Sequence, residues 1–156
     1  MNKVVLITGG ARGIGSAIAL ELAKHGYDIV INYLTSKQPA KELKEKIESQ
    51  YHVRCLTICA DVSDVDQVNI MVSEVEEKMG GVDILINNAA VDLSNLFHLK
   101  NAEEFKRTFD VNVVGAFNCS KRVYKHMLDQ EYGRIINISS TNGINTYYPM
   151  LSLIHI

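Results

Sequence analysis

The sequence predicts an α/β fold in which a parallel sheet is covered by helices on both faces. Short apolar runs alternate along the chain with segments whose apolar residues recur at helical spacing. Glycines end several of these segments, as is typical of turns between strands and helices. No linker, repeat or low-complexity stretch divides the 156 residues. Strands and helices that alternate in this way form right-handed crossovers, which together give a doubly wound parallel sheet of the Rossmann type.

Composition indicates a globular protein and argues against several partners. The chain is 47% hydrophobic and 22% charged, with a net charge of -2. Because Lys and Arg are scattered rather than clustered, nucleic acid is not an expected partner. No apolar run approaches the roughly 20 residues that a membrane-spanning helix needs. The short apolar stretch after Lys3 does not have the form of a secretory signal, so we expect a cytoplasmic protein without a membrane partner.

The three cysteines are Cys55, Cys59 and Cys119. An odd number without a framework spacing suits a reducing compartment. Cys55 and Cys59 lack the tight spacing of a redox or zinc pair, so all three are expected to be core thiols, and no metal site is predicted.

Five strands are expected, each from a short apolar run. They span residues 4–7, 29–31, 53–58, 82–86 and 134–138. The fold is expected to stop after the fifth strand. Because parallel sheets of this kind bind ligands at the carboxyl ends of their strands, the chemistry is expected just after each strand.

Helices are expected between the strands. Gly26 ends the first helix, and Pro39 starts the second. Ser63 is expected to cap the third helix, with Asp64 and Asp66 at its positive end. The apolar positions are Ile14, Ala17, Ile18 and Leu22 in the first helix, Leu43 and Ile47 in the second, Val65, Val68, Met71 or Val72, Val75 and Met79 in the third, and Phe105, Phe109, Val113 and Phe117 in the fourth.

The loop from Thr8 to Gly15 joins the first strand to the first helix and is predicted to bind the pyrophosphate of a dinucleotide. Its glycines permit a tight turn, and the unpaired N–H groups and dipole of the helix attract a phosphate. A plain glycine-rich turn is the alternative, but the strand–loop–helix context favours nucleotide binding. The residues expected at the phosphates are Gly9, Ala11, Arg12, Gly13, Ile14 and Gly15.

The loop has the spacing Thr-Gly-x-x-x-Gly-x-Gly and resembles that of the short-chain dehydrogenase/reductase family. The same order of motifs continues with Asp61-Val62, Asn87-Asn88-Ala89-Ala90, Asn112 and the segment from Gly133 to Ser140, so the resemblance extends from Val4 to about Gly143. The family usually has Gly where this chain has Ala90. That methyl group is expected to tighten the cofactor groove without undermining the assignment.

The sequence favours NADP(H) over NAD(H). The second strand ends with Asn32 and Tyr33 and has no carboxylate to bind the ribose hydroxyls of NAD. Arg12 lies within the loop, where its planar fork suits a 2′-phosphate, and Ser36 and Lys37 add to the same end of the site. The resemblance implies the same choice; the alternative is that Arg12 is a solvated loop residue.

The resemblance implies further cofactor contacts after the third and fourth strands. Asp61, followed by Val62, would contact the adenine amino group, although Asp61 also suits the end of a strand. Asn88, followed by Ala89, would lie at the cofactor ribose. Asn87 is expected to hold neighbouring backbone.

The resemblance also implies hydride transfer between nicotinamide and a carbonyl or alcohol carbon. Asn112 and Ser140 would be members of the catalytic tetrad; the alternatives are an ordinary helix residue and a turn serine. No Tyr with a Lys four residues later follows Ser140, although family spacing puts that Tyr near Leu153. Tyr147 and Tyr148 are expected to line the substrate loop instead. The chain alone is therefore expected to be nearly inactive.

Two functional hypotheses remain open at this point. In the first, the parent is an NADP-dependent carbonyl reductase, for example of 3-oxoacyl groups on acyl carrier protein, acting on a small-molecule or carrier-linked substrate. In the second, a short protein binds the dinucleotide as a sensor; Asn112 and Ser140 argue against it. Residues 1–150 would form an incomplete dinucleotide-binding domain, and residues 151–156 a non-native tail.

The resemblance bears on assembly as well. Family members commonly pair through the long helix that carries Phe105 to Phe117, which implies a homodimer or homotetramer for the full-length parent. The aromatic stripe is equally compatible with a place in the core. An uncovered sheet edge predicts low solubility for the chain as it stands.

Overall fold

The computed structural model describes residues 2–93 and 97–140. The expectations for Tyr147, Tyr148 and residues 151–156 lie outside them. The elements, in order, are β1 Val4–Ile7, α1 Gly13–Lys24, β2 Asp28–Tyr33, α2 Lys37–Tyr51, β3 Cys55–Cys59, α3 Val65–Met79, β4 Ile84–Asn87, a 3₁₀ turn Phe97–Leu99, α4 Ala102–Phe109, a π-helical segment Asp110–Val114, α5 Gly115–Asp129 and β5 Arg134–Asn137.

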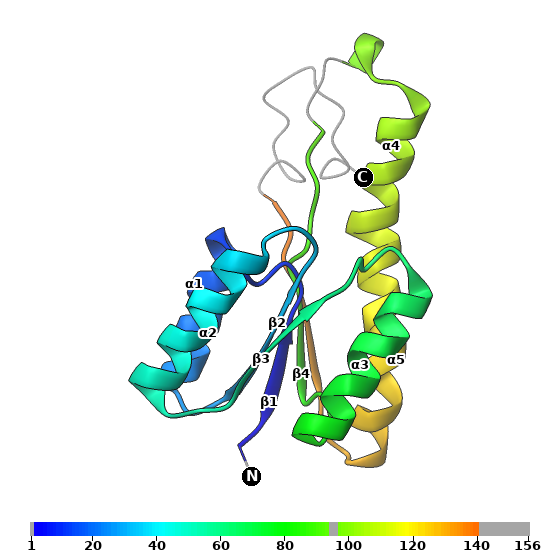
Figure 1. Ribbon diagram of the computed structural model, residues 1–156. Coiled ribbons are helices and arrows are strands. Elements are labelled where there is room, and N and C mark those ends of the chain that lie inside the picture. Colours follow the sequence, from blue (N-terminus) through cyan, green and yellow to red (C-terminus); the bar gives the residue numbers. More distant parts are fainter. Residues whose placement is uncertain (1, 94–96, 141–156) are drawn as a thin grey trace.

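The predicted α/β fold is confirmed. The strands form one five-stranded sheet in the order β3-β2-β1-β4-β5, and every pair is parallel. Helices α1 and α2 cover one face, and α3 and α5 cover the other (Figure 1). The strand order reverses between β1 and β4, so loops after these strands diverge to opposite sides and leave room for a ligand at their carboxyl ends.

Helix α1 packs against the sheet through small residues. Gly15, Ala19 and Ala23 are its buried positions, so the helix axis can approach the strands closely. Ile14, by contrast, is 63% exposed and is free to line a surface groove. The small residues therefore determine how near the N-terminus of α1 lies to the end of β1.

The start of α3 differs from the prediction. Asp64, and not Ser63, is the N-cap, and its carboxylate accepts hydrogen bonds from the N–H groups of Asp66 and Gln67 at 2.9 and 3.2 Å. Val65 is exposed and lies outside the buried stripe. A one-residue shift of the cap turns Val65 toward solvent, while Ser63 becomes available for contacts with Asp61.

The long fourth helix is α4, the π-helical segment and α5 in succession, and Figure 1 shows them as one column beside the sheet. The aromatic stripe on this column is not core. Phe105, Phe109 and Val113 are about two-fifths exposed, and Phe117 is 61% exposed. Tyr124 and Leu128 continue the exposed apolar surface along α5, so this face is available to a partner.

Two smaller expectations are resolved by the burial of side chains. Cys55 and Cys119 are buried as expected, but Cys59, the last residue of β3, is exposed. All four residues of β5 are exposed, and among the described strands it pairs with β4 alone. Within residues 2–93 and 97–140, no helix is both long and apolar enough to cross a bilayer.

Candidate functional site

Two adjoining clefts lie at the carboxyl ends of the strands. The first has a volume of about 670 Å³ and extends from the glycine loop across the ends of β2 and β3. The second has a volume of about 660 Å³ and extends from the end of β4 to the end of β5. Their shared wall consists of Val62, Asn88, Ala89, Ala90, Val91 and Val111. Together they form one groove across the point where the strand order reverses, which is where ligands of such sheets bind.

The glycine loop is anchored to both neighbouring strands. The hydroxyl of Thr8 accepts hydrogen bonds from the N–H groups of Asn88 and Ala89, both at 3.0 Å. The amide of Asn88 in turn donates to the carbonyl groups of Thr8 and Gly9 at 3.0 and 3.1 Å. Thr8 is itself buried. Its part in the loop is therefore to join β1 to β4.

Asn32 fixes the loop from the other side. Its Oδ1 accepts from the N–H of Gly9 at 3.2 Å, and its Nδ2 donates to the carbonyl of Ala60 at 3.0 Å. The carbonyl of Asn32 also accepts from the N–H of Gly10 at 2.9 Å. Because Asn32 is only 2% exposed, its amide shapes the groove from beneath.

Two glycines of the loop cannot be replaced without displacing the walls of the groove. A Cβ on Gly15 would lie 2.6 Å from Nδ2 of Asn88 and 2.7 Å from the carbonyl oxygen of Gly9. A Cβ on Gly9 would lie 2.9 Å from the Cα of Ala89, and the φ of Gly9 is +60°. These contacts bring the N-terminus of α1 directly under the first cleft, with room for a flat group above the backbone.

The N-terminus of α1 has the properties of an anion site. Arg12 is the N-cap residue, makes no side-chain hydrogen bond to the first turn, and is exposed at the edge of the cleft. The first turn has no acidic residue. The N–H groups of that turn and the helix dipole are thus directed at the cleft without a competing carboxylate.

A second helix N-terminus borders the same cleft. Ser36 is the N-cap of α2, makes no side-chain capping bond, and lines the cleft beside Tyr33. The first turn of α2 also lacks an acidic residue, and Lys37 is its first residue. A phosphate on the ribose would find donors here as well as at Arg12.

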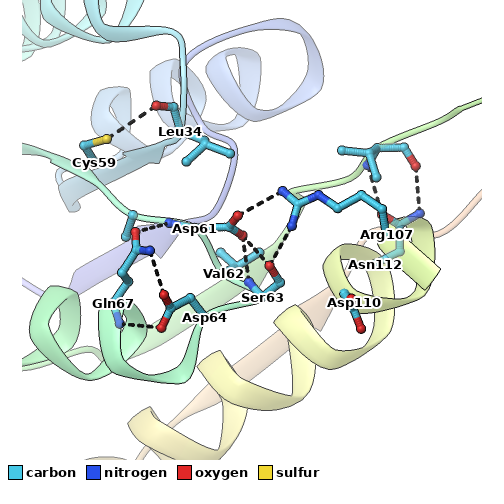
Figure 2. Close-up of polar contacts among 12 residues, drawn as sticks. Leu34, Cys59, Asp61, Val62, Ser63, Asp64, Gln67, Arg107, Asp110 and Asn112 are labelled. Atoms are coloured by element: carbon cyan, nitrogen blue, oxygen red, sulfur yellow. Dashed lines mark hydrogen bonds and ion pairs between the residues drawn. The ribbon is translucent and has the colours of Figure 1, made fainter. Parts of the chain in front are cut away.

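Asp61 lies at the far end of the first cleft, in a cluster that includes Arg107 of α4 (Figure 2). Its Oδ1 accepts from the N–H and hydroxyl of Ser63 at 2.9 and 2.6 Å, and its Oδ2 accepts from Arg107 at 2.9 Å. Partial burial raises the pKa of Asp61, but the hydrogen bonds from Ser63 and the ion pair with Arg107 outweigh it. The pKa is therefore below the usual value, and the group is a carboxylate at neutral pH.

Asn112 lies in the π-helical segment and lines the second cleft. Its Oδ1 accepts from the N–H of Val91 at 2.9 Å, and its Nδ2 donates to the carbonyl of Val91 at 3.1 Å. The amide therefore holds the loop after β4 against the helix. π-Helical turns are rare and occur frequently at functional sites.

Ser140 follows β5 and lines the same cleft as Asn112, and Ser139 precedes it on the wall. Asn87 was expected to hold backbone, but its Nδ2 donates to side chains, at 3.1 Å to Ser120 and at 2.9 Å to Asn137. These bonds connect β4 to α5 and β5 beneath the second cleft.

The structure thus gathers the predicted residues into one groove. Asn112 and Ser140 lie on the second cleft, as does Ile14, whereas Gly15 is packed beneath the loop. The predicted cofactor residues on the first cleft are Gly9, Ala11, Arg12, Gly13, Asn32, Tyr33, Ser36, Asp61, Val62, Asn88 and Ala89.

Sequence reasoning missed Arg107 and the anchoring roles of Thr8 and Val91. Thr8 begins the glycine motif, so its position was a usable signal. Arg107 and Asp61 are 46 residues apart, and nothing in the local sequence of α4 links them. Val91 contributes only backbone atoms, which the sequence pattern cannot reveal.

Comparison with known proteins adds a family to this geometry. The model of the family described as short chain dehydrogenase matches residues 3–152. A 3-oxoacyl-acyl-carrier-protein reductase of Staphylococcus aureus is 41% identical over 143 residues, which cover 92% of this chain and 58% of the relative. An acetoacetyl-CoA reductase of Paracoccus denitrificans is 37% identical over 143 residues, which cover 92% of this chain and 57% of the relative.

Solved structures agree with the fold. Acetoin dehydrogenase YohF from Salmonella typhimurium superposes with a TM-score of 0.88 and 35% identity, covering 99% of this chain and 60% of that one. NAD+-bound xylitol dehydrogenase also gives a TM-score of 0.88, with 30% identity over 95% of this chain and 56% of that one. The chain therefore spans somewhat more than half the length of these relatives.

Proposed function

The chain belongs to the short-chain dehydrogenase family, and on that premise we propose that it is the dinucleotide-binding part of an NADP(H)-dependent oxidoreductase acting on a carbonyl or alcohol group. The observation that carries the proposal is the anion site at α1. Gly15 allows the first turn of α1 to lie close to Asn88, because a Cβ at that position would clash with the Asn88 side chain. The first turn has no acidic residue that would compete with an anion for its N–H groups. These residues fit a dinucleotide, with the pyrophosphate at the N–H groups of α1 and the adenosine along the first cleft.

The preference for NADP(H) rests on two donors at the ribose end of this cleft. Arg12 is exposed, and its side chain makes no capping hydrogen bond. Ser36 is the N-cap of α2, where the helix dipole favours an anion. No carboxylate follows Asn32 and Tyr33 at the end of β2, so nothing there repels a 2′-phosphate.

The second cleft would hold the reacting end of the cofactor. Nicotinamide, when bound, supplies the hydride chemistry. Ser140 offers a hydroxyl to the substrate oxygen from the carboxyl end of β5, and Asn112 holds Val91 and the π-helical segment that form the facing wall. Asn112 therefore acts by positioning the wall.

The proposed substrate is a carbonyl compound, either a small molecule or an acyl group linked to a carrier. The names of the two curated relatives support this, since 3-oxoacyl and acetoacetyl thioesters share a ketone at the same position. No Tyr with Lys four residues on follows Ser140. The pair Tyr33 and Lys37 has that spacing, but Tyr33 lines the first cleft. The chain by itself should bind dinucleotide without turnover.

The exposed apolar face of α4 and α5 is proposed to pair with the same face of a second copy. Phe109, Phe117 and Leu128 are exposed along the continuous column of α4, the π-helical segment and α5 (Figure 1), and a self-complementary patch on a helix suits a two-fold axis. A homodimer or homotetramer would follow for the full-length protein.

A fluorescence titration tests the central proposal. NADPH and NADH are added to the chain at fixed salt, and binding is followed through nicotinamide fluorescence. One charge-assisted hydrogen bond to the 2′-phosphate predicts that NADPH binds about tenfold more tightly or better. Tighter binding of NADH would contradict the cofactor preference, and binding of neither would contradict the dinucleotide site.

A further inference from the structure

We infer that Arg107 is a positioning residue for nucleobase recognition: together with Ser63 it orients the Asp61 carboxylate so that the cleft accepts a 6-aminopurine and discriminates against a 6-oxopurine. This inference rests on the proposed dinucleotide site, and it assigns to α4 a part in that site which the glycine loop does not supply. The cluster is defined here as Asp61, Ser63 and Arg107 (Figure 2).

The three side chains form a closed ring of hydrogen bonds. Nη2 of Arg107 donates to Oδ2 of Asp61 at 2.9 Å, and Nη1 donates to the hydroxyl of Ser63 at 2.8 Å. That hydroxyl donates to Oδ1 of Asp61 at 2.6 Å, and the N–H of Ser63 donates to the same oxygen at 2.9 Å. Rotation of the carboxylate about its χ2 angle would break bonds at both oxygens, so its plane is fixed.

Among the residues that the structure describes, one acceptor position of the Asp61 carboxylate receives no donor. A carboxylate offers about four lone-pair positions. Oδ1 of Asp61 receives two donors from Ser63, and Oδ2 receives one from Arg107. The open position is therefore on Oδ2, the oxygen that Arg107 holds. Asp61 lines the first cleft, and its side chain is 20% exposed.

The open position on Oδ2 accepts a hydrogen bond and cannot donate one. The exocyclic amino group of adenine is a donor and satisfies it. The carbonyl oxygen of hypoxanthine is an acceptor and would face a carboxylate lone pair across the same gap, an arrangement without a hydrogen bond and with charge repulsion. Selectivity depends on the ionised form, and the lowered pKa of Asp61 is consistent with that form at neutral pH.

Arg107 contacts Asp61 and Ser63 from a separate element, α4. It lies in the last turn of α4, a helix whose start is fixed by the capping box of Asn101 and Glu104. Arg107 also lines the first cleft. Loss of Arg107 would leave Oδ2 without a partner and free the carboxylate to turn, while the N–H of Ser63 would still hold Oδ1.

Isothermal titration with ADP and inosine 5′-diphosphate tests the inference. These probes differ at the purine and occupy only the adenosine half of the groove, so no residue after Ser140 is needed. The wild-type chain should bind ADP about tenfold or more tightly than inosine diphosphate. Arg107→Met should weaken ADP binding and bring the ratio of the two dissociation constants close to one, with inosine diphosphate affected much less. Arg107→Lys should keep part of the ratio, and Ser63→Ala, a milder change, should lower it.

Arg122→Met is the matched control. Arg122 forms a similar two-bond pair with Glu76, at 2.8 and 2.7 Å, between α5 and α3 and away from both clefts that form the groove. It should lower the melting temperature while leaving the ADP ratio at the wild-type value.

A pH series supplies a readout that a purely structural role would not move. In the wild type, the ADP preference should persist until the pH falls through the lowered pKa of Asp61, and in Arg107→Met any residual preference should disappear at a higher pH. An unchanged ratio in folded Arg107→Met, with Asp61→Asn abolishing the ratio, would overturn the inference and leave the dinucleotide site intact. Failure of the wild type to bind either nucleotide would overturn the proposed function itself, and the inference with it.

Discussion

The side-chain amide of Asn112 pairs with the backbone of Val91 in the way that two strands pair. Oδ1 accepts from the N–H of Val91 at 2.9 Å, and Nδ2 donates to its carbonyl at 3.1 Å. A residue of the π-helical segment thus fixes the loop that leaves β4 and forms the wall shared by the two clefts. This single pair accounts for an Asn in an otherwise apolar stretch of helix.

Replacing Asn112 by Ala should loosen this wall. Two backbone groups of Val91 lose their partners, which predicts a loss of about 1–3 kcal/mol in the free energy of unfolding. Urea denaturation measures the loss, and hydrogen exchange at the Val91 amide should become faster. Asn112→Asp keeps the acceptor and removes the donor, so exchange at Val91 should stay slower than in Asn112→Ala; equal rates would contradict the pairing.

Gly15→Ala should impair dinucleotide binding and stability together. The new methyl group would meet Nδ2 of Asn88 at 2.6 Å and the carbonyl of Gly9 at 2.7 Å, so the loop must move. Overpacking of this kind costs about 1–3 kcal/mol. Gly26→Ala, where the Cβ meets open space and only the φ of +84° is strained, is the control. NADPH binding should be lost in the first variant and kept in the second; retained binding in Gly15→Ala would count against the close approach.

Arg12→Gln should reduce the preference for NADPH over NADH without abolishing NADH binding. Arg12 makes no side-chain capping bond and lies at the edge of the first cleft, so its removal takes away a charge and leaves the fold intact. Loss of one charge-assisted bond predicts about a tenfold weaker affinity for NADPH. An equal loss for both cofactors in the titration would place Arg12 at the pyrophosphate instead.

The three thiols should react at very different rates. Burial raises the pKa of Cys55 to about 12, with a further increase from Glu48, and burial raises the pKa of Cys119 to about 12. Their thiolate fractions are therefore negligible at pH 8. Cys59 is exposed and should react first with a chromogenic disulfide, the other two only after unfolding in guanidinium. Cys59→Ser should remove the fast phase, and a fast phase that survives it would contradict the assignment.

Phe117→Glu should weaken self-association. Phe117 is 61% exposed on the column formed by α4 and α5, and a charge there opposes burial against a second copy. Analytical ultracentrifugation should show the wild type associating through this face and the variant dissociating at the same concentration. Ile70→Glu, a 67% exposed position on α3, controls for added charge; an equal effect of both variants would locate association elsewhere.

The periodic parts of the fold could be predicted from the sequence because the spacing of apolar residues within each strand or helix indicates its buried face. Strand β1 has the bounds that its apolar run predicts, and the parallel sheet follows from the alternation of elements. The predicted cap of α3 is wrong by one residue. Ser63 and Asp64 have similar intrinsic capping ability, but Ser63 is held by Asp61 and Asp64 is also held by the side chain of Gln67.

The candidate site was predictable where a motif defines it and not where distant elements meet. The glycine loop carries its own signal, so Gly9 and Gly15 could be placed from their spacing alone. Arg107 could not, because its partner lies 46 residues away on another element. The exposure of Cys59 was missed, and that of Phe117 was left open, for a related reason: an apolar pattern does not reveal which side chains remain uncovered.

Because of the π-helical segment Asp110–Val114, the number of residues between α4 and α5 is itself constrained. Each residue turns a helix by about 100°. Deleting one residue here would restore regular α-helix, but it would swing either Asn112 away from Val91 or the buried face of Cys119, Val123 and Met127 away from the sheet. Substitutions should be tolerated in this segment far more readily than insertions or deletions.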